Sequence, residues 1–468
     1  MLFFGSVRCA TNIFSLVAVL VVLAGNAEGF SQLSVAPSPR PRCGVTSPAL
    51  RATNNGENAI GLPRTTRRNA FGTGVAFCGM LTSLLGSAAS MSANASSDSS
   101  PPSGSTAIAF RTIKLPVSDF GVTVPVSVWY QVATDSSKPL PPDVKYDYKI
   151  SLRRIGQLLA KWEFIPEFVS KDFSLTPSAS ASSSTTRVVD GKNIPIPGTT
   201  NAKAGTNVVF LAHGYLGSRS DLGYIAEELA SQGFVCVAAE YPESLEASYP
   251  KLEGLDRVAI NKRLVPYVKD ELVPQPILSY SAIGHSLGCG TVLQMGDDSW
   301  SRVLMGSGRA PASPSARNKP TSINGDAVYK NPVVGGRLLF ISSVNDGPVN
   351  SWGGGITIPD GYTVLQESKL QENGGAVVAQ IKNLDRVALV FNGEKAPNHI
   401  SFLSENVNDA MLEFLSPLLP VSKALDIPVL DFDKYADSRD SVATGRVLKP
   451  LISSFLAGAS EARKNSKS

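Results

Sequence analysis

The sequence predicts an α/β protein built on a mostly parallel, doubly wound sheet with helices on both faces. Two observations favour this fold class. From Asn207 onward, short apolar runs of strand length alternate with segments of helical length, which is typical of a parallel sheet. One of these runs leads directly into Gly284-His285-Ser286-Leu287-Gly288, a turn in which a Ser lies between two Gly. The 468 residues are enough for one large domain and N-terminal targeting segments.

The predicted domain spans residues 107–468 and begins with an antiparallel hairpin. Residues 111–133 alternate in strand fashion around a central Gly, and Val124–Tyr130 is rich in β-branched and aromatic side chains. Residues 136–205 form a predicted insertion, in which Lys149–Ser170 carries apolar residues at helical spacing and a Ser/Ala-rich loop follows. Two interpretations of the insertion stay open: a helical lid over an apolar pocket, or a helix packed on the sheet.

The remainder of the domain alternates strands and helices. Gly233 is expected to end the first of these helices as its C-cap. Residues 307–336 and 351–380 are excursions in which we predict no element. The predicted strands are Val208–Ala212, Phe234–Ala239, Ser279–Ile283, Arg302–Met305, Arg337–Ile341 and Arg386–Phe391, and the predicted helices are Leu222–Ser231 and Arg257–Leu272.

The first 95 residues differ in charge from the rest of the chain. They hold seven Arg, no Lys and two acidic residues. The whole chain has 43 Lys and Arg and 39 Asp and Glu, so residues 96–468 carry 36 basic and 37 acidic side chains. The positive net charge therefore belongs to the leader, and the near-neutral body predicts no binding to nucleic acid.

Three targeting signals in series are predicted in this leader. Residues 1–29 contain an apolar run and a small-residue cleavage site, as in a signal peptide. Residues 30–66 have the composition of a transit peptide, and residues 67–95 join a twin Arg, a soft apolar run and Ala93-Asn94-Ala95, as in a thylakoid-lumen signal. Residues 96–106 are a Ser/Pro linker. We expect import into a plastid, with the thylakoid lumen as the final compartment; the alternative is the secretory pathway, or a membrane anchor retained at residues 70–89.

Cysteine usage predicts neither disulfides nor a metal site. Three of the five Cys lie in the leader, and only Cys236 and Cys289 remain in the body. Both are expected to be packing residues, since two isolated Cys form no disulfide framework and no metal-ligand cluster. The body also lacks a Gly-rich phosphate loop. No cofactor or metal is therefore predicted.

The Gly-flanked Ser has the pattern of a nucleophile elbow, a sharp strand-to-helix turn that exposes the Ser hydroxyl. Side chains at Gly284 or Gly288 would collide with the neighbouring strand and helix, while Ser286 itself must adopt a strained conformation. The amide end of the following helix adds a positive dipole beside the hydroxyl. Ser286 is the candidate nucleophile.

A Ser hydroxyl needs a base within hydrogen-bond reach, and the chain has three His. His285 lies inside the turn, beside the Ser, and His213 follows a strand at the position expected for an oxyanion loop. His399 remains, on the loop after the last predicted strand. We therefore expect His399 to be the base.

The base needs an acid to orient it, and in this arrangement the chain order is Ser, acid, His. Asp346 follows the predicted strand Arg337–Ile341 and is the favoured acid. Asp385 precedes a strand and so lies at the wrong end of the sheet, and Asp360 lies in an excursion without a predicted element. The expected oxyanion hole consists of the amides of Leu287 and of Gly214 or Tyr215.

These motifs resemble those of the α/β-hydrolase superfamily of serine esterases. Val124–Tyr130, Ser231-Gln232-Gly233-Phe234 and the strand ending at Glu240-Tyr241 are similar to platelet-activating-factor acetylhydrolase-like enzymes, although Gln232 and Tyr241 replace the usual His. His213-Gly214-Tyr215-Leu216 and the Ser motif also look like chlorophyllases, which have Arg where Leu287 stands. The resemblance covers roughly residues 108–420 and implies an α/β-hydrolase fold with an inserted lid-like segment.

The predicted function is hydrolysis of a hydrophobic carboxylic ester by a Ser286, His399 and Asp346 triad. In a plastid the substrate would be the phytyl ester of chlorophyll or a membrane lipid, which would bring the protein to a membrane surface. Two alternatives stay open: a platelet-activating-factor acetylhydrolase-like phospholipase, and a hydrolase-fold protein that binds a lipid or pigment without cleaving it. Oligomeric state is not predicted.

Overall fold

The structure is a computed structural model of the chain. The predicted leader and most of the linker lie outside the residues it describes, as does much of the predicted insertion. The described residues are 106–132, 142–144, 146, 148–159, 173–175, 186–196, 205–273, 276–313, 334–352, 355–408 and 437–467. They all belong to one compact unit of the chain.

Among the described residues, ten strands form one sheet in the order β11-β12-β10-β9-β8-β6-β7-β2-β1-β5. In this spatial order, every pair of neighbouring strands between β11 and β7 is parallel. β2 is antiparallel to both of its neighbours, β7 and β1. The predicted parallel sheet with an antiparallel opening hairpin is confirmed. The strands are β1 (Thr106–Val117), β2 (Val122–Gln131), β5 (Thr186–Asp190), β6 (Thr206–Ala212), β7 (Phe234–Ala239), β8 (Ile277–His285), β9 (Ser301–Met305), β10 (Leu338–Ser343), β11 (Thr363–Leu365) and β12 (Arg386–Phe391).

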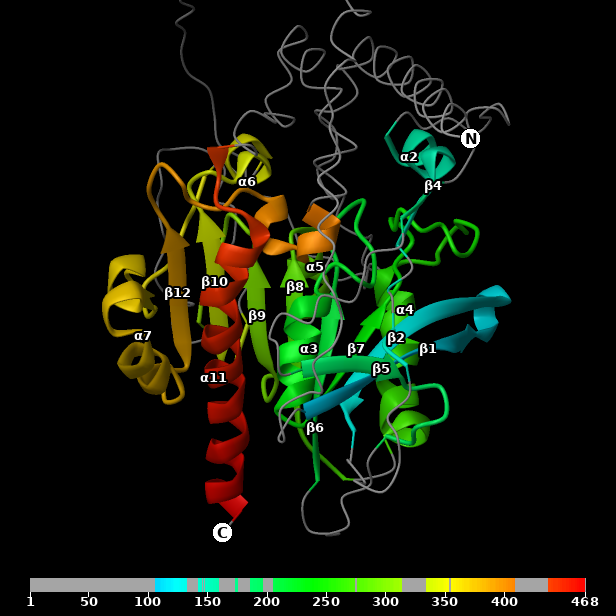
Figure 1. Cartoon of the computed structure of the whole chain (residues 1–468), viewed down its shortest axis with the longest axis horizontal. Helices are drawn as coiled ribbons and strands as arrows, with labels where there is room; N and C mark the ends of the chain where they lie inside the picture. The colour runs from blue at the N-terminus through cyan, green and yellow to red at the C-terminus, as the bar shows by residue number, and fades with distance from the viewer. Residues whose placement is uncertain are drawn as a thin grey trace, which may run out of the picture. The chain divides into compact units, whose positions relative to one another are not determined.

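Helices cover both faces of this sheet, which is why its central strands are continuous apolar runs. Alternate side chains of β6 show the division: Phe210 belongs to one apolar core, and Val209 and Leu211 belong to the other. One core includes α4 (Arg257–Tyr267), its extension to Leu272 and α5 (Leu287–Leu293). The other includes α3 (Gly223–Ser231), α7 (Glu367–Ile381) and α11 (Ser441–Lys467), which lie on one face (Figure 1).

The insertion differs from the predicted helical segment. Lys149 and Ile150 lie in strand β3 (Tyr148–Ile150), which pairs with β4 (Phe173–Leu175), so helix α2 begins only at Leu152 and is described to Leu159. β5 pairs in parallel with β1 and extends the main sheet. The predicted helix is therefore present from Leu152, but the prediction that helical structure begins at Lys149 was wrong, because Lys149 and Ile150 pair with β4. The Ser/Ala-rich loop lies largely outside the described residues.

Several elements were not predicted. Helix α7 and strand β11 occupy the excursion at 351–380. Asn373, Gly374 and Gly375 lie in the middle of α7, and these poor helix formers hide the helix from sequence patterns. Packing of its Val377 and Ile381 against the sheet outweighs that propensity. A short helix α6 (Gly347–Trp352) follows β10.

Because the strands β6, β8, β10 and β12 are parallel, their carboxyl ends meet at one edge of the sheet, toward which the arrowheads of β8, β10 and β12 point in Figure 1. Within the described part of the chain, no helix has the length and apolar character needed to cross a bilayer.

Candidate active site

Ser286 occupies a strained turn between β8 and α5. Its φ of 55° and ψ of −120° are unusual for a residue with a side chain, and such backbone conformations cost roughly 1–3 kcal/mol. The turn is held on both sides: the Ser286 amide donates to the Met305 carbonyl at 2.9 Å, and the Ser286 carbonyl accepts from the Cys289 amide at 2.9 Å. The Ser286 side chain is partly exposed, so a substrate has access to it.

The two flanking glycines are required by close backbone contacts. A Cβ at Gly284 would lie 2.3 Å from the Gly288 carbonyl oxygen, and a Cβ at Gly288 would lie 2.0 Å from the Ala212 carbonyl oxygen. Both distances are far inside van der Waals contact. The turn therefore brings α5 directly against the end of β6, as the sequence motif predicts.

Asp346 and His399 meet at the carboxyl ends of β10 and β12. His399 Nδ1 lies 2.9 Å from Asp346 Oδ1 and 2.8 Å from Oδ2, and Asp346 is fully buried. The Val349 amide also donates to Oδ1 at 3.0 Å. Because a proton on Nδ1 satisfies the carboxylate, Nε2 of His399 is left as the unprotonated nitrogen, which is the form that accepts a proton.

His285 links this pair to the Ser turn. Its Nε2 lies 3.0 Å from the His399 carbonyl oxygen, and the two imidazole rings have centroids 4.6 Å apart. Burial, and then the nearby His399, lower the pKa of His285 well below its ordinary value, so the ring is neutral and Nε2–H donates to that carbonyl. The residue before the nucleophile therefore supports the loop that carries the base. Sequence reasoning placed His285 beside Ser286 but missed this contact.

The expected oxyanion loop lies against the turn. A Cβ at Gly214 would lie 3.1 Å from the Ser286 Cβ. His213 Nε2 accepts from the Tyr241 amide at 3.0 Å, so its Nδ1–H donates to the Gly214 carbonyl at 2.7 Å. Burial, and then Arg257, lower the pKa of His213 well below its ordinary value. His213 is thus a neutral structural residue that holds the loop.

The described part of the insertion borders the same site. Tyr215 Oη donates to the Leu158 carbonyl of α2 at 3.0 Å. Arg154 of α2 donates to the Pro242 and Tyr249 carbonyls, in the segment after β7. Tyr215 and Leu287 are also among the exposed large hydrophobic residues, at 36% and 40% exposure. α2 therefore contacts Tyr215, which follows the Gly214 that lies against the Ser286 turn.

Neither remaining Cys competes as a nucleophile. Cys289 is buried, its Sγ lies 3.2 Å from the Gly284 carbonyl oxygen, and burial raises the pKa of its thiol to about 12. Cys236 is buried in β7, where burial also raises its pKa. In the part of the chain that the structure describes, no three His, Cys, Asp or Glu side chains gather as a metal site would require.

The two other candidate acids lie elsewhere. Asp385 precedes β12, and its backbone carbonyl accepts from the Leu338 amide at the amino ends of the strands. Asp360 is an exposed turn residue. Within the described part of the chain neither carboxylate hydrogen-bonds His399, whereas both oxygens of Asp346 lie within hydrogen-bond distance of its Nδ1.

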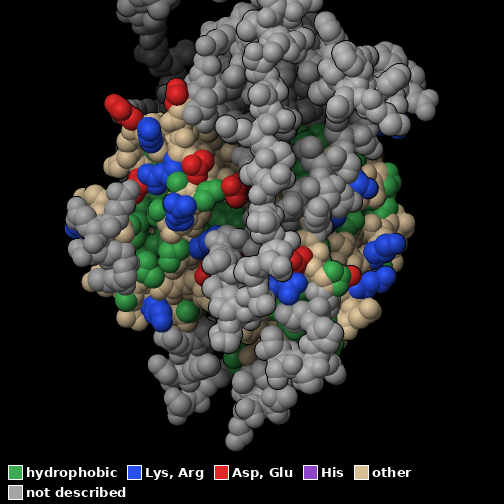
Figure 2. Space-filling model, viewed as in Figure 1, with side chains coloured by type: hydrophobic (Ala, Val, Ile, Leu, Met, Phe, Trp, Pro, Cys, Tyr) green, Lys and Arg blue, Asp and Glu red, His purple; other side chains and the backbone are tan. Residues whose placement is uncertain are grey.

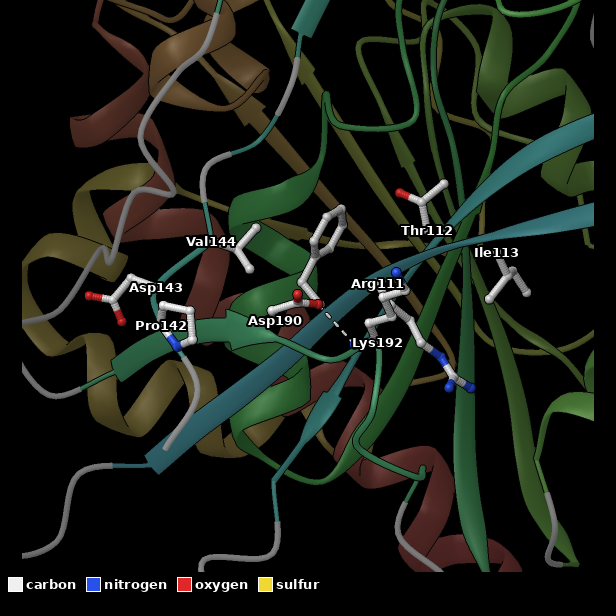
Figure 3. Close-up of a pocket in the computed structure, with 9 residues that line it drawn as sticks. Arg111, Thr112, Ile113, Pro142, Asp143, Val144, Asp190 and Lys192 are labelled. Atoms are coloured by element: carbon white, nitrogen blue, oxygen red, sulfur yellow. Dashed lines mark hydrogen bonds between the residues drawn. The ribbon is translucent and has the colours of Figure 1, made fainter. Parts of the chain in front are cut away.

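An open groove of about 540 Å³ lies away from these residues, at the sheet edge formed by β1, β5 and residues 142–144 (Figure 3). Its lining includes Arg111, Asp143, Asp190 and Lys192, and the Lys192 amide donates to Asp190 at 2.9 Å. Acidic and basic side chains are mixed, and none of the candidate site residues line it.

The strand order, the strained Ser turn and the chain order Ser286, Asp346, His399 define an α/β-hydrolase fold.

No protein-family model matches the chain, and no curated protein sequence matches it. Solved structures similar to it include a ferulic acid esterase from Streptomyces cinnamoneus, at 13% identity and a TM-score of 0.36, covering 76% of this chain and 90% of that chain. A dienelactone hydrolase from Anabaena variabilis is 13% identical with a TM-score of 0.27, covering 62% and 88%. An esterase from Pyrococcus furiosus is 12% identical with a TM-score of 0.27, covering 67% and 90%. These sequence identities and TM-scores are too low to support any conclusion about the substrate of this protein.

Proposed function

We propose that the protein is a serine hydrolase of carboxylic esters, with Ser286 as nucleophile, His399 as base and Asp346 as the acid that orients it. The observation that carries this proposal is the buried Asp346 carboxylate on His399 Nδ1, which is linked through His285 to the strained turn of Ser286. A carboxylate on His Nδ1 is the arrangement that orients a catalytic base, and strained backbone of this kind clusters at active sites.

In this mechanism Ser286 Oγ attacks the ester carbonyl carbon while His399 Nε2 takes the hydroxyl proton. Asp346 stabilises the imidazolium that forms. The tetrahedral intermediate collapses, the alcohol leaves with the proton from His399, and an acyl-Ser286 ester remains. Water, deprotonated by His399, then attacks this ester and releases the acid, which restores the Ser hydroxyl.

The negative oxygen of each tetrahedral intermediate would be bound by the amide of Leu287, at the start of α5, and by the amide of Gly214 or Tyr215. The close approach of Gly214 to Ser286 supports this assignment. Loss of one such donor typically lowers the rate by about 10²–10³-fold.

The proposed substrate is an uncharged, hydrophobic ester. Leu287, which follows Ser286 in the chain, and Tyr215 of the neighbouring loop are exposed, and α2 contacts Tyr215. Residues 96–468 carry 36 basic and 37 acidic side chains, so no strong net charge favours a charged substrate. On the face shown in Figure 2, the described Lys, Arg, Asp and Glu side chains are interspersed. If the predicted leader directs the protein to a plastid, the proposed substrate is the phytyl ester of chlorophyll or a membrane glycerolipid, reached at a membrane surface.

The test uses the full chain and its Ser286→Ala variant. Wild type should hydrolyse short 4-nitrophenyl esters with a burst of one nitrophenol per active site, and Ser286→Ala should show neither burst nor turnover. Equal turnover by the two proteins would refute the function. Binding of an apolar ligand without hydrolysis of any ester would instead support the non-catalytic alternative.

Chlorophyll, a galactolipid and an acetyl-phospholipid, each in detergent, then separate the substrate classes through release of phytol, fatty acid or acetate. Cleavage of the acetyl-phospholipid alone would favour the platelet-activating-factor acetylhydrolase-like alternative over the plastid substrates.

A further inference from the structure

Arg257 is a buried cation that the proposed chemistry does not use. Its side chain is 9% exposed, at the first position of α4. A cation at a helix N-terminus is unfavourable to the helix dipole, so the helix does not explain its placement. Its Nε donates to Glu243 at 3.0 Å, and its guanidinium lies over the Tyr241 ring at 4.5 Å. These contacts with Glu243 and Tyr241 hold the Arg257 side chain in place.

The remaining donors of Arg257 are directed at the oxyanion loop. Nη1 donates to the His213 carbonyl at 2.7 Å, and Nη2 donates to the Gly214 carbonyl at 3.1 Å. In a trans peptide the N–H points opposite to the C=O. With both carbonyls turned toward Arg257, the amides of Gly214 and Tyr215 point away from it. Gly214 is close to both groups: its carbonyl accepts from the guanidinium, and a Cβ on it would lie 3.1 Å from Ser286 Cβ. This is the arrangement expected if the two amides face the nucleophile.

The same guanidinium also reaches the helix that supplies the other oxyanion amide. Nη1 donates to Thr291 Oγ1 at 3.1 Å, and Thr291 Oγ1 lies 3.4 Å from the Leu287 carbonyl oxygen. One rigid, planar group therefore joins the 213–215 loop to Thr291 of α5, and the Thr291 hydroxyl connects it to the Leu287 carbonyl in the first turn. Lys has a single ammonium in place of this fork and would hold fewer of these acceptors.

We propose that Arg257 is a positioning residue that clamps the two halves of the oxyanion hole, the 213–215 loop and the N-terminal turn of α5. The inference rests on the proposed serine-hydrolase function. Arg257 acts through the peptides it holds and does not touch the substrate. Its removal should therefore raise the energy of the tetrahedral intermediate more than it weakens substrate binding.

The test compares 4-nitrophenyl butyrate with its thionoester, in which sulfur replaces the carbonyl oxygen. Sulfur is a larger and weaker hydrogen-bond acceptor, so the thionoester gains less from a well-placed oxyanion hole. In the full chain, Arg257→Met should lower kcat on the oxygen ester by roughly 10–100-fold, with KM within about twofold. The decrease in kcat of Arg257→Met on the thionoester should be smaller than on the oxygen ester. The kcat of Arg257→Lys on the oxygen ester should lie between those of Arg257→Met and wild type.

Arg302 offers a matched control. It is also buried, and it donates to the Val292 and Met295 carbonyls at the opposite end of α5. Arg302→Lys should cost comparable thermal stability and leave the oxygen-to-sulfur rate ratio unchanged. If Arg257→Met does not fold, the rate ratios of Arg257→Lys and Arg302→Lys are compared instead.

Three results would overturn the inference: unchanged kcat in the Arg257 variants, equal losses on the two esters, or the same change of rate ratio in Arg302→Lys. If Ser286→Ala is inactive and the Arg257 variants behave as wild type, only the clamp is refuted. If Ser286→Ala retains full turnover, the proposed function fails instead.

Discussion

Replacement of Asp346 by Asn tests the acid of the proposed triad. Asn keeps the size of the side chain and an oxygen that can accept from the Val349 amide, which lies 3.0 Å from Oδ1. It removes the charge that faces His399 Nδ1 at 2.8 Å inside a fully buried site. A neutral amide cannot stabilise the imidazolium, and its NH₂ group favours the wrong His tautomer. We expect kcat to fall by about 10⁴-fold, which corresponds to about 5 kcal/mol of transition-state stabilisation.

Hydrolysis of 4-nitrophenyl butyrate by the full chain measures this effect, with near-ultraviolet circular dichroism to verify folding. Asp385→Asn is the matched control, because Asp385 also lies between Ser286 and His399 in the chain but is at the opposite ends of the strands. It should retain wild-type kcat within about twofold. Activity of Asp346→Asn within about tenfold of wild type, or a larger loss in Asp385→Asn, would refute the reasoning.

Two further predictions concern stability. Gly288→Ala should lower the free energy of unfolding by about 2–3 kcal/mol or more, because its Cβ would lie 2.0 Å from the Ala212 carbonyl oxygen. Gly290→Ala, where the added Cβ meets open space on the same helix, should raise the free energy of unfolding by about 0.5–1 kcal/mol. Similar urea midpoints for the two variants would contradict this prediction. Burial raises the pKa of Glu227 from 4.5 to about 8, and Tyr146 donates a hydrogen bond to this carboxyl group at 2.5 Å. The contribution of Glu227 to folding stability is therefore fully present below about pH 4.5 and is lost as the pH rises through about 8. Glu227→Gln should therefore lose less stability than wild type between about pH 5 and pH 9, and parallel melting curves would count against the raised pKa.

The central strands were predictable because each is buried on both faces and so has an uninterrupted apolar run. Phe234–Ala239 and Arg386–Phe391 agree with β7 and β12 at both ends, and β10 lies one or two residues from its prediction. Helix α7 was missed because its Gly pair opposes the helix locally, and its packing partners are distant in sequence. The pairing of β5 with β1 was missed for the same reason: no local pattern encodes a partner.

The residues at the candidate site were predictable to a different extent. With three His in the chain, a fixed order of Ser, acid and base leaves few assignments, and the structure brings Asp346 and His399 together. Arg257 carried no sequence signal, because an Arg at the start of a helix usually faces solvent. Its role depends on carbonyl directions at His213 and Gly214, which only the folded backbone defines.

Covalent labelling of the nucleophile tests the central claim most directly. The full chain and its Ser286→Ala variant are treated with a fluorophosphonate, and intact mass and peptide mapping locate the adduct. We predict one adduct per wild-type chain, on the peptide that contains Ser286, and none on Ser286→Ala. An adduct on another residue, undiminished labelling of Ser286→Ala, or an active wild-type enzyme that the probe does not modify would contradict a Ser286 nucleophile.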